Sequence, residues 1–231
     1  AALLCGGVWC EECQAQAVID QVDPPVLQRG RVNRIRIAGS QVEQVLGLWT
    51  STPGAELSAK PVEAGDGKSV AIDVAVPSDA PLGIYGLRLS TRSGLSNPTL
   101  FVIDELPVQT RPTTNDAADG SKPNAAMPLS LPACVAAPCR KEQVDRYSIS
   151  VKAGEKVTFE VIGNRLGRDY DPLVTVRDAA NRIVAQGDND VGLFFDCRFE
   201  HRFMEGGTYF VDVSDARYLG EPHWNYVLRI G

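Results

Sequence analysis

The sequence predicts an all-β protein with two antiparallel β-sandwich domains joined by a linker. Apolar and polar residues alternate in short runs along most of the 231 residues, and this period of two is typical of strands that bury one face. Gly, Pro, Asn and Asp separate the runs at intervals of roughly ten residues, as in β-sandwiches. A stretch rich in Pro, Thr and Asn interrupts the alternation near the middle of the chain and therefore predicts a domain boundary.

Composition and charge narrow the classes of partner. Hydrophobic residues make up 44% of the chain, which is enough for ordinary cores, and 23 basic against 29 acidic residues give a net charge of −6. The longest run of basic residues is Arg140-Lys141. The chain thus lacks the concentrated positive field that attracts nucleic acid or an anionic membrane surface. No apolar run is long enough to span a bilayer.

Residues 1–17 look like the end of a secretory signal peptide. A short apolar run over residues 1–9 is followed by Ala15-Gln16-Ala17, a small-x-small pattern typical of cleavage sites. We therefore expect an exported protein, in which disulfides are permitted.

Six cysteines are present, and none belongs to a complete zinc motif. Cys134 and Cys139 flank a small loop near prolines, where a disulfide could close; two free thiols in a linker are the alternative. Cys197 falls on the core-facing phase of a predicted strand and is expected to behave as a small hydrophobe.

Residues 18–106 are predicted to form the first sandwich. An extended segment over residues 22–30 contains two adjacent prolines, which disfavour helix. Alternating strands are expected at 34–37, 70–76, 85–89 and 100–103. Residues 80–89 and 94–98 resemble the end of immunoglobulin-like modules of the IPT/TIG kind, and this resemblance implies an Ig-like sandwich.

Residues 107–139 are predicted to be a linker. Pro, Thr, Asn and Asp dominate this segment and apolar residues are few in most of it, so no core of its own is expected.

Residues 140–231 are predicted to form the second sandwich, because alternation is strongest here. The expected inward-facing rows are Tyr147/Ile149/Val151, Val157/Phe159/Val161, Leu173/Val174/Val176, Ile183/Val184, the odd positions of 193–199, Tyr209/Val211/Val213 and Trp224/Tyr226/Leu228/Ile230.

The second sandwich resembles the bacterial pre-peptidase C-terminal (PPC) domain. The matching segments are residues 145–149, 153–157, 171–178, 185–190, 206–213 and 226–230. The resemblance implies a jelly-roll-like, non-catalytic sandwich that binds extracellular polymers or supports secretion and processing of an attached enzyme. Its tandem with an Ig-like module is similar to exported planctomycete proteins. Collagen-binding relatives hold calcium through an acidic stretch before the sandwich, but here Arg111 stands where an acidic ligand is expected.

A calcium site is a separate expectation from the residues themselves. Asp188, Asn189 and Asp190 supply oxygen ligands within three residues, and Asp169 and Asp171 supply two more in another loop. An Asx-rich turn whose side chains bond their own backbone is the alternative.

Exposed aromatic side chains are candidates for ligand contact. Phe194 and Phe210 are expected on the outward phase of their strands, and Tyr218 and Trp224 lie in or beside a loop. Packing against the linker or the neighbouring domain is the alternative. Catalysis is not expected, because there are only two histidines and no HExxH, GxSxG or phosphate-loop motif.

The sequence therefore predicts a non-enzymatic accessory module, secreted or at the bacterial cell surface or periplasm. Its expected partner is an extracellular polysaccharide or protein, or an attached enzyme. The alternative hypothesis is a fragment of a larger exported peptidase or other hydrolase whose catalytic domain lies outside this chain.

Overall fold

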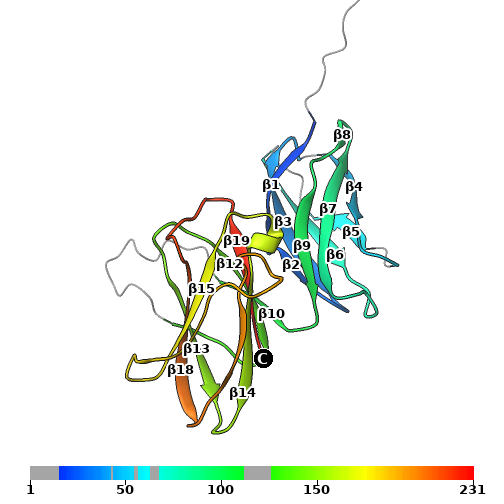
Figure 1. Cartoon of the computed structure of the whole chain (residues 1–231). Helices are drawn as coiled ribbons and strands as arrows, with labels where there is room; N and C mark the ends of the chain where they lie inside the picture. Colours follow the sequence, from blue (N-terminus) through cyan, green and yellow to red (C-terminus); the bar gives the residue numbers. More distant parts are fainter. Residues whose placement is uncertain (1–15, 43, 55–56, 63–67, 112–125) are drawn as a thin grey trace, which may run out of the picture.

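The computed structural model describes residues 16–42, 44–54, 57–62, 68–111 and 126–231, and it confirms an all-β protein with two sandwiches (Figure 1). Most of the segment predicted to be the end of a signal peptide, with Cys5, Cys10 and Cys13, lies outside the described residues. The helical content of the described part is one three-residue 3-10 turn, η1 (Asn164–Leu166). None of its helices is therefore long and apolar enough to cross a membrane.

The first sandwich packs two sheets around a core of branched aliphatic side chains. One sheet has the order β1 (Val18–Asp23), β3 (Val32–Ser40), β6 (Ser69–Ala75), β5 (Ser58–Pro61). The other has the order β2 (Val26–Gln28), β9 (Thr99–Asp104), β7 (Gly83–Thr91), β4 (Val45–Thr50), with β8 (Gly94–Leu95) paired to β7. The predicted alternation is confirmed, since Ile35, Ile37, Ile72, Val74, Leu87 and Leu89 are all buried in this core.

The second sandwich consists of two five-stranded sheets. One has the order β10 (Val108–Thr110), β12 (Ala133–Pro138), β19 (Asn225–Ile230), β14 (Lys156–Ile162), β17 (Arg198–Arg202). The other has the order β11 (Met127–Pro128), β13 (Asp145–Val151), β18 (Gly207–Asp215), β15 (Pro172–Arg177), β16 (Ile183–Gly187). Tyr147, Phe159, Val211 and Leu228 from facing strands meet in the core, as the inward rows predict.

The segment predicted as a linker contributes strands to the second sandwich. β10, β11 and β12 all lie within residues 107–139, and β12 is an interior strand between β10 and β19. Ala133, Val135 and Ala137 face the core, while Cys134 and Ala136 face the other way and are also buried. A strand buried on both faces shows no polar alternation, which is why the sequence pattern did not reveal it.

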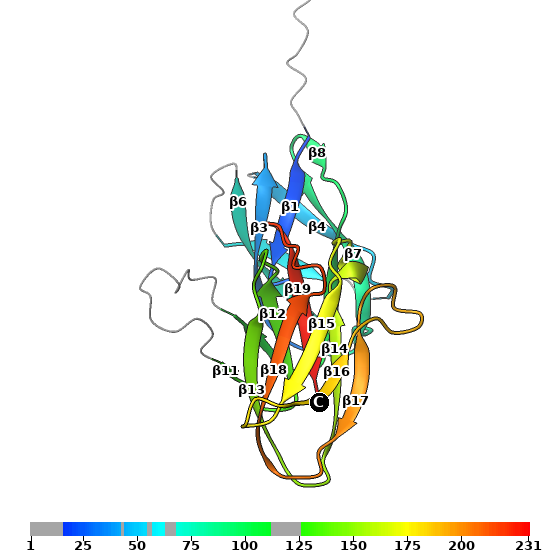
Figure 2. The ribbon, with the colours of Figure 1, turned by 60° about the vertical axis from the view of Figure 1, so that its left-hand side comes forward.

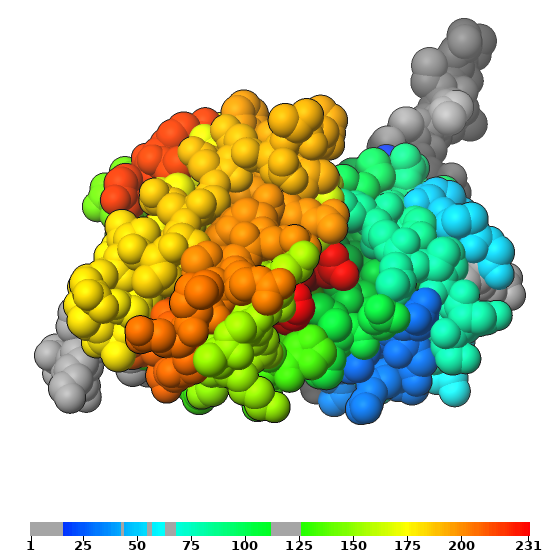
Figure 3. Space-filling view, turned by 60° about the horizontal axis from the view of Figure 1, so that its bottom comes forward, coloured from blue at the N-terminus to red at the C-terminus, as the bar shows by residue number. Residues whose placement is uncertain are grey.

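The two sandwiches meet at an apolar cluster that we call the seam. It lies between the outer face of the β2-β9-β7-β4 sheet and the outer face of the β10-β12-β19-β14-β17 sheet. Its buried members are Val26, Val102, Cys134, Ala136, Ile162, Leu166 and Val227. Figure 3 shows the C-terminal residues (red) between the orange surface of the second sandwich and the green surface of the first.

Polar contacts also cross the seam. Arg229 Nε donates to Asp104 Oδ2 of the first sandwich at 2.5 Å, and Arg229 Nη1 donates to Glu160 Oε2 at 2.6 Å. The amide of Asn225 donates to the Val22 carbonyl at 2.7 Å. The η1 turn lies at the boundary between the sandwiches and contacts β9 (Figures 1 and 2).

Candidate binding surface

The β16–β17 connection, residues 188–197, is the most unusual surface feature of the second sandwich. It crosses from one sheet to the other and is folded on itself by backbone hydrogen bonds. The Asp190 N–H donates to the Asp196 carbonyl at 3.2 Å, the Leu193 N–H to the Asp190 carbonyl at 3.1 Å, and the Asp196 N–H to the Leu193 carbonyl at 3.1 Å. We call residues 188–196 the tip loop.

Asp196 anchors the tip loop to η1. Its side chain is fully buried, and Oδ1 accepts the backbone N–H groups of Gly163 and Asn164 at 2.8 and 2.7 Å. Its Oδ2 accepts Arg165 Nε at 2.7 Å and the Arg165 backbone N–H at 3.2 Å. Four donors thus converge on one carboxylate, which compensates the cost of burying its charge.

Gly163 has to be glycine for this contact. A Cβ at that position would lie 2.2 Å from the Tyr170 ring. The missing side chain lets the start of η1 lie against Tyr170 while its N–H groups face Asp196.

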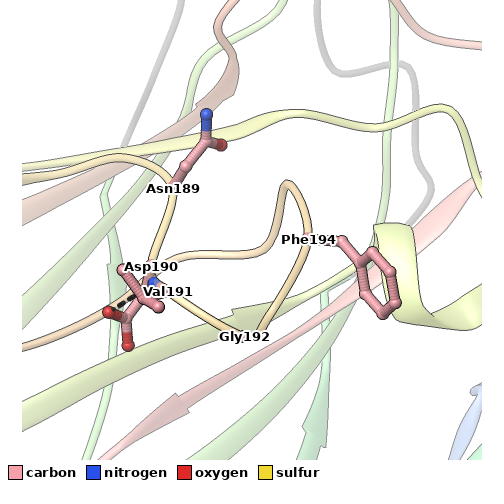
Figure 4. A pocket seen from close by; sticks show the side chains of 5 residues that line it. All are labelled: Asn189, Asp190, Val191, Gly192 and Phe194. Atoms are coloured by element: carbon pink, nitrogen blue, oxygen red, sulfur yellow. Dashed lines mark hydrogen bonds between the residues drawn. The ribbon is translucent and has the colours of Figure 1, made fainter.

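The outer end of the tip loop is apolar and exposed. Val191 is 100% exposed, Phe194 77% and Phe195 48%. Val191 and Phe194, with Asn189, Asp190 and Gly192, line an open hollow of about 430 Å³. Figure 4 shows the Phe194 ring pointing out from the loop, away from the limb that carries Asn189 and Asp190.

Phe194 also has a strained backbone. Its φ is +59°, a left-handed conformation that bulky residues rarely adopt. The structure therefore corrects the expectation that residues 193–199 form one strand: β17 begins only at Arg198. Cys197 is buried in the core as predicted.

The five residues predicted to bind calcium are only partly brought together. The Asn189 amide nitrogen lies 3.0 Å from Asp171 Oδ1 and 3.3 Å from Asp188 Oδ1, in the orientation that makes it a donor. Burial raises the pKa of the Asp171 carboxyl, and the charge of Asp188 raises it further.

The other two acidic side chains have different partners. Asp169 pairs with Arg217 at 2.9 Å, and the Asp190 carboxylate accepts the Val191 N–H at 2.8 Å. Among the described residues, no three His, Cys, Asp or Glu side chains are arranged to hold a metal ion. The Asp188 and Asp190 carboxylates each accept the backbone N–H of the next residue, at 2.9 and 2.8 Å.

Arg111, which stands where an acidic calcium ligand was expected from the resemblance, contacts β13 of the second sandwich. Arg111 lies with Nε 3.2 Å from Asp145 Oδ1, and its guanidinium also donates to the Arg146 carbonyl at 3.1 Å. A fixed side-chain cation therefore neutralises Asp145. Residues 112–116 of the corresponding stretch lie outside the described residues.

The four candidate aromatic residues occupy four different surroundings. Phe194 is on the tip loop. Phe210 is half-buried, and Arg146 Cζ lies over the Phe210 ring, 5.7 Å from the ring centroid. Trp224 is half-buried against the second core. Tyr218 is 56% exposed in the β18–β19 connection, where its carbonyl accepts the Glu142 N–H at 3.0 Å. Phe194 is therefore the most exposed of the four.

The predicted disulfide between Cys134 and Cys139 is contradicted, because both thiols are free and buried. The residues lie five apart along an extended segment, roughly 16 Å at strand rise, and a disulfide needs Cα atoms within about 7 Å. Their side chains also point to different clusters, Cys134 to the seam and Cys139 to the second core. Burial raises the pKa of Cys139 to about 12.

Two residues of the tip loop were not singled out from the sequence. Val191 directly follows the acidic segment 188–190. An aliphatic residue at that position was the only sequence signal that could have indicated an exposed apolar side chain. Asp196 was expected to face solvent, because alternation between Phe195 and Cys197 placed it on the polar phase of a strand.

Comparison with known proteins gives distant structural likenesses. No family model and no curated sequence matches the chain. The periplasmic inhibitor of g-type lysozyme, PliG, from Aeromonas hydrophila shares 14% identity, with 54% of this chain and 96% of that chain covered and a TM-score of 0.36. SGBP-B, from the mixed-linkage glucan utilization locus of Bacteroides ovatus, shares 9% identity, with 90% of this chain and 71% of that chain covered and a TM-score of 0.29.

A third similar structure is the secreted serine protease VesC from Vibrio cholerae, at 10% identity, with 94% of this chain and 51% of that chain covered and a TM-score of 0.31. The chain is thus distantly similar in structure to bacterial β-sandwich proteins, two of which are named as periplasmic or secreted.

Proposed function

We propose that this chain is a non-catalytic, exported binding module, and that it contacts an extracellular polymer through the apolar end of the tip loop. The observation that carries the proposal is the exposed Phe194, which has a left-handed backbone in a loop anchored through the buried Asp196. Strain of this kind is retained where the surrounding structure enforces it, and it concentrates at functional positions. A preformed contact residue loses little entropy on binding.

The chemistry of the hollow favours a polysaccharide over other polymers. An exposed aromatic ring offers a flat apolar face to the C–H face of a sugar ring. Asn189 and Asp190 line the same hollow, and the Asn189 side-chain carbonyl and Asp190 Oδ2 are acceptors for sugar hydroxyl groups. The resemblance of the second sandwich to PPC domains agrees with an accessory role beside other exported domains.

The two histidines have separate surroundings in the second sandwich. The His201 ring packs edge-on against Phe203, with centroids 4.7 Å apart, and His223 is exposed in the connection before β19.

Retention on insoluble polymers tests the proposal. The full chain and its Phe194→Ala variant are incubated with insoluble polysaccharides and with fibrillar collagen, with and without a chelator. We expect retention on a polysaccharide that Phe194→Ala lowers about tenfold, the scale of one lost aromatic contact. Tyr218 is also exposed and has the same left-handed backbone, with φ +58°, but it lies outside the tip loop. Tyr218→Ala therefore serves as the control and should be retained like the wild type.

Three outcomes would contradict the proposal or part of it. Absence of retention on every polymer would refute binding. Equal losses for Phe194→Ala and Tyr218→Ala would show that the tip loop is not the contact surface. Retention on collagen alone would replace the polysaccharide with a fibrous protein.

A further inference from the structure

We infer that the first sandwich positions the tip loop of the second through η1, so that the binding unit is the two-domain chain. This inference rests on the proposed function of the tip loop. It assigns Arg165 and Leu166 as positioning residues, and neither of them lines the hollow beside Phe194.

One side of η1 is hydrogen-bonded to the tip loop. The Asp196 carboxylate receives three consecutive backbone N–H groups, those of Gly163, Asn164 and Arg165, together with Arg165 Nε. Because Asp196 is fully buried, any movement of η1 that removed these donors would leave an unpaired charge in the interior. The end of the tip loop therefore has to follow η1.

The other side of η1 is held by the first sandwich. Leu166 is buried in the seam beside Val26 and Val102 of β2 and β9. The 3-10 turn is only three residues long, so the side chain that packs on the first sandwich directly follows the one that holds Asp196. Short 3-10 segments have little stability of their own and depend on such packing.

A chain of ion pairs follows the same route. Asp104 of the first sandwich pairs with Arg229, Arg229 pairs with Glu160, and Glu160 Oε1 accepts Arg165 Nη2 at 2.8 Å. Arg165 Nε in turn pairs with Asp196 Oδ2 at 2.7 Å. Each of the three carboxylates is at least nine-tenths buried in its side chain, so these contacts are well shielded from salt.

Docking of the first sandwich and order of the tip loop should therefore be coupled. When the seam loosens, Leu166 loses its apolar partners on the first sandwich and Arg229 loses one of its two carboxylates. The η1 turn then samples other positions, and the tip loop leaves the conformation that presents Phe194. Such a coupling changes the fraction of molecules whose tip loop presents Phe194, although the residues that contact the ligand stay the same.

Hydrogen exchange of the full chain tests the inference. Val102→Ala weakens the seam, and Asp104→Asn removes the charge at the start of the ion-pair chain while preserving shape. Val74→Ala removes the same two methyl groups from the core of the first sandwich, away from the seam, and is the matched control. Mass spectrometry follows the amides of residues 188–196, and the polysaccharide retention assay is run on the same proteins.

We expect roughly tenfold faster exchange of the tip loop in Val102→Ala and Asp104→Asn, with β18 amides exchanging as in the wild type. Retention should fall in the same two variants and stay unchanged in Val74→Ala. Unchanged tip-loop exchange in both seam variants, with β9 exchange accelerated, would overturn the inference. Equal acceleration in Val74→Ala would also overturn it, because the effect would then follow global stability.

The two proposals fail in different ways. If Phe194→Ala is retained like the wild type while the seam variants still loosen the tip loop, the proposed contact surface is wrong and the positioning stands. If Phe194→Ala loses retention and the seam variants change neither exchange nor retention, the contact surface stands and the positioning is wrong.

Discussion

Arg229 at the end of the last strand lies 2.5 Å from Asp104 of the first sandwich, and the same guanidinium reaches Glu160 at 2.6 Å. The Asp104 side chain is 2% exposed and that of Glu160 8%. One cation thus neutralises two buried carboxylates, one from each sandwich. These ion pairs are therefore buried polar contacts of the seam, and one of them joins the two sandwiches.

Replacement of Arg229 by Ala should destabilise the protein strongly. Two buried carboxylates would lose their common partner, and breaking a buried pair costs about 3–5 kcal/mol. Because the Arg229 side chain is 34% exposed, we expect the lower end of this range. Urea denaturation measures the loss. Arg29→Ala, which removes the pair with the exposed Glu105, is the control and should cost less than about 1 kcal/mol.

Replacement of Asp196 by Ala should release the tip loop. The N–H groups at the start of η1 lose their acceptor and Arg165 loses one of its two carboxylates, so we expect a cost of about 3 kcal/mol. Hydrogen exchange should accelerate at residues 188–196 and at 163–166 together. Asp188→Asn changes an exposed carboxylate of the same loop and should leave both regions as they are. Acceleration of one region without the other would contradict a shared anchor.

The buried thiols should be unreactive in the folded protein. Burial raises the pKa of Cys139 and Cys197 to about 12 and that of Cys134 well above its usual value, so all three remain protonated at neutral pH. Iodoacetamide labelling with peptide mapping should modify these positions only after denaturation. Peptides carrying Cys134 and Cys139 should have the same mass with and without reductant. A two-dalton gain on reduction would reinstate the disulfide.

Stability should fall on acidification through Glu160. Burial favours its neutral form, but Arg165 and Arg229 outweigh burial and hold the pKa of this carboxyl below its usual value. The unfolded chain then binds the proton more tightly, so Glu160 stabilises the fold above its unfolded-state pKa. This contribution is lost as the pH falls through the folded-state pKa.

A pH series of Glu160→Gln checks this direction. The difference in unfolding free energy between the wild type and the variant should be largest at neutral pH and should shrink towards zero in acid, where the wild-type side chain is also neutral. A difference that does not vary with pH would contradict the assigned ion pairs.

The sequence predicted strands wherever one face of a strand meets a core and the other meets water. Tyr147, Ile149 and Val151 alternate for this reason, and so do Ile35 and Ile37 in the first sandwich. Such alternation is a local consequence of strand geometry, so it is visible without knowledge of the partner strands.

The same pattern misled where burial depended on the rest of the molecule. Residues 193–199 alternate like a strand, yet Asp196 is captured by η1 more than thirty positions earlier in the chain and the segment becomes a loop. The linker expected at 107–139 contains β12, which is buried on both faces because the first sandwich covers one of them.

The amino-acid order alone therefore determined the all-β class, the division into two sandwiches and the candidate Phe194. Tertiary structure alone decided that Phe194 stands on an anchored loop, that Cys134 and Cys139 are apart, and that an ion-pair chain joins the sandwiches. The physical reason is range: strand periodicity is set by neighbours in sequence, whereas the partners of Asp196, Arg229 and Cys134 are set by segments that meet only after folding.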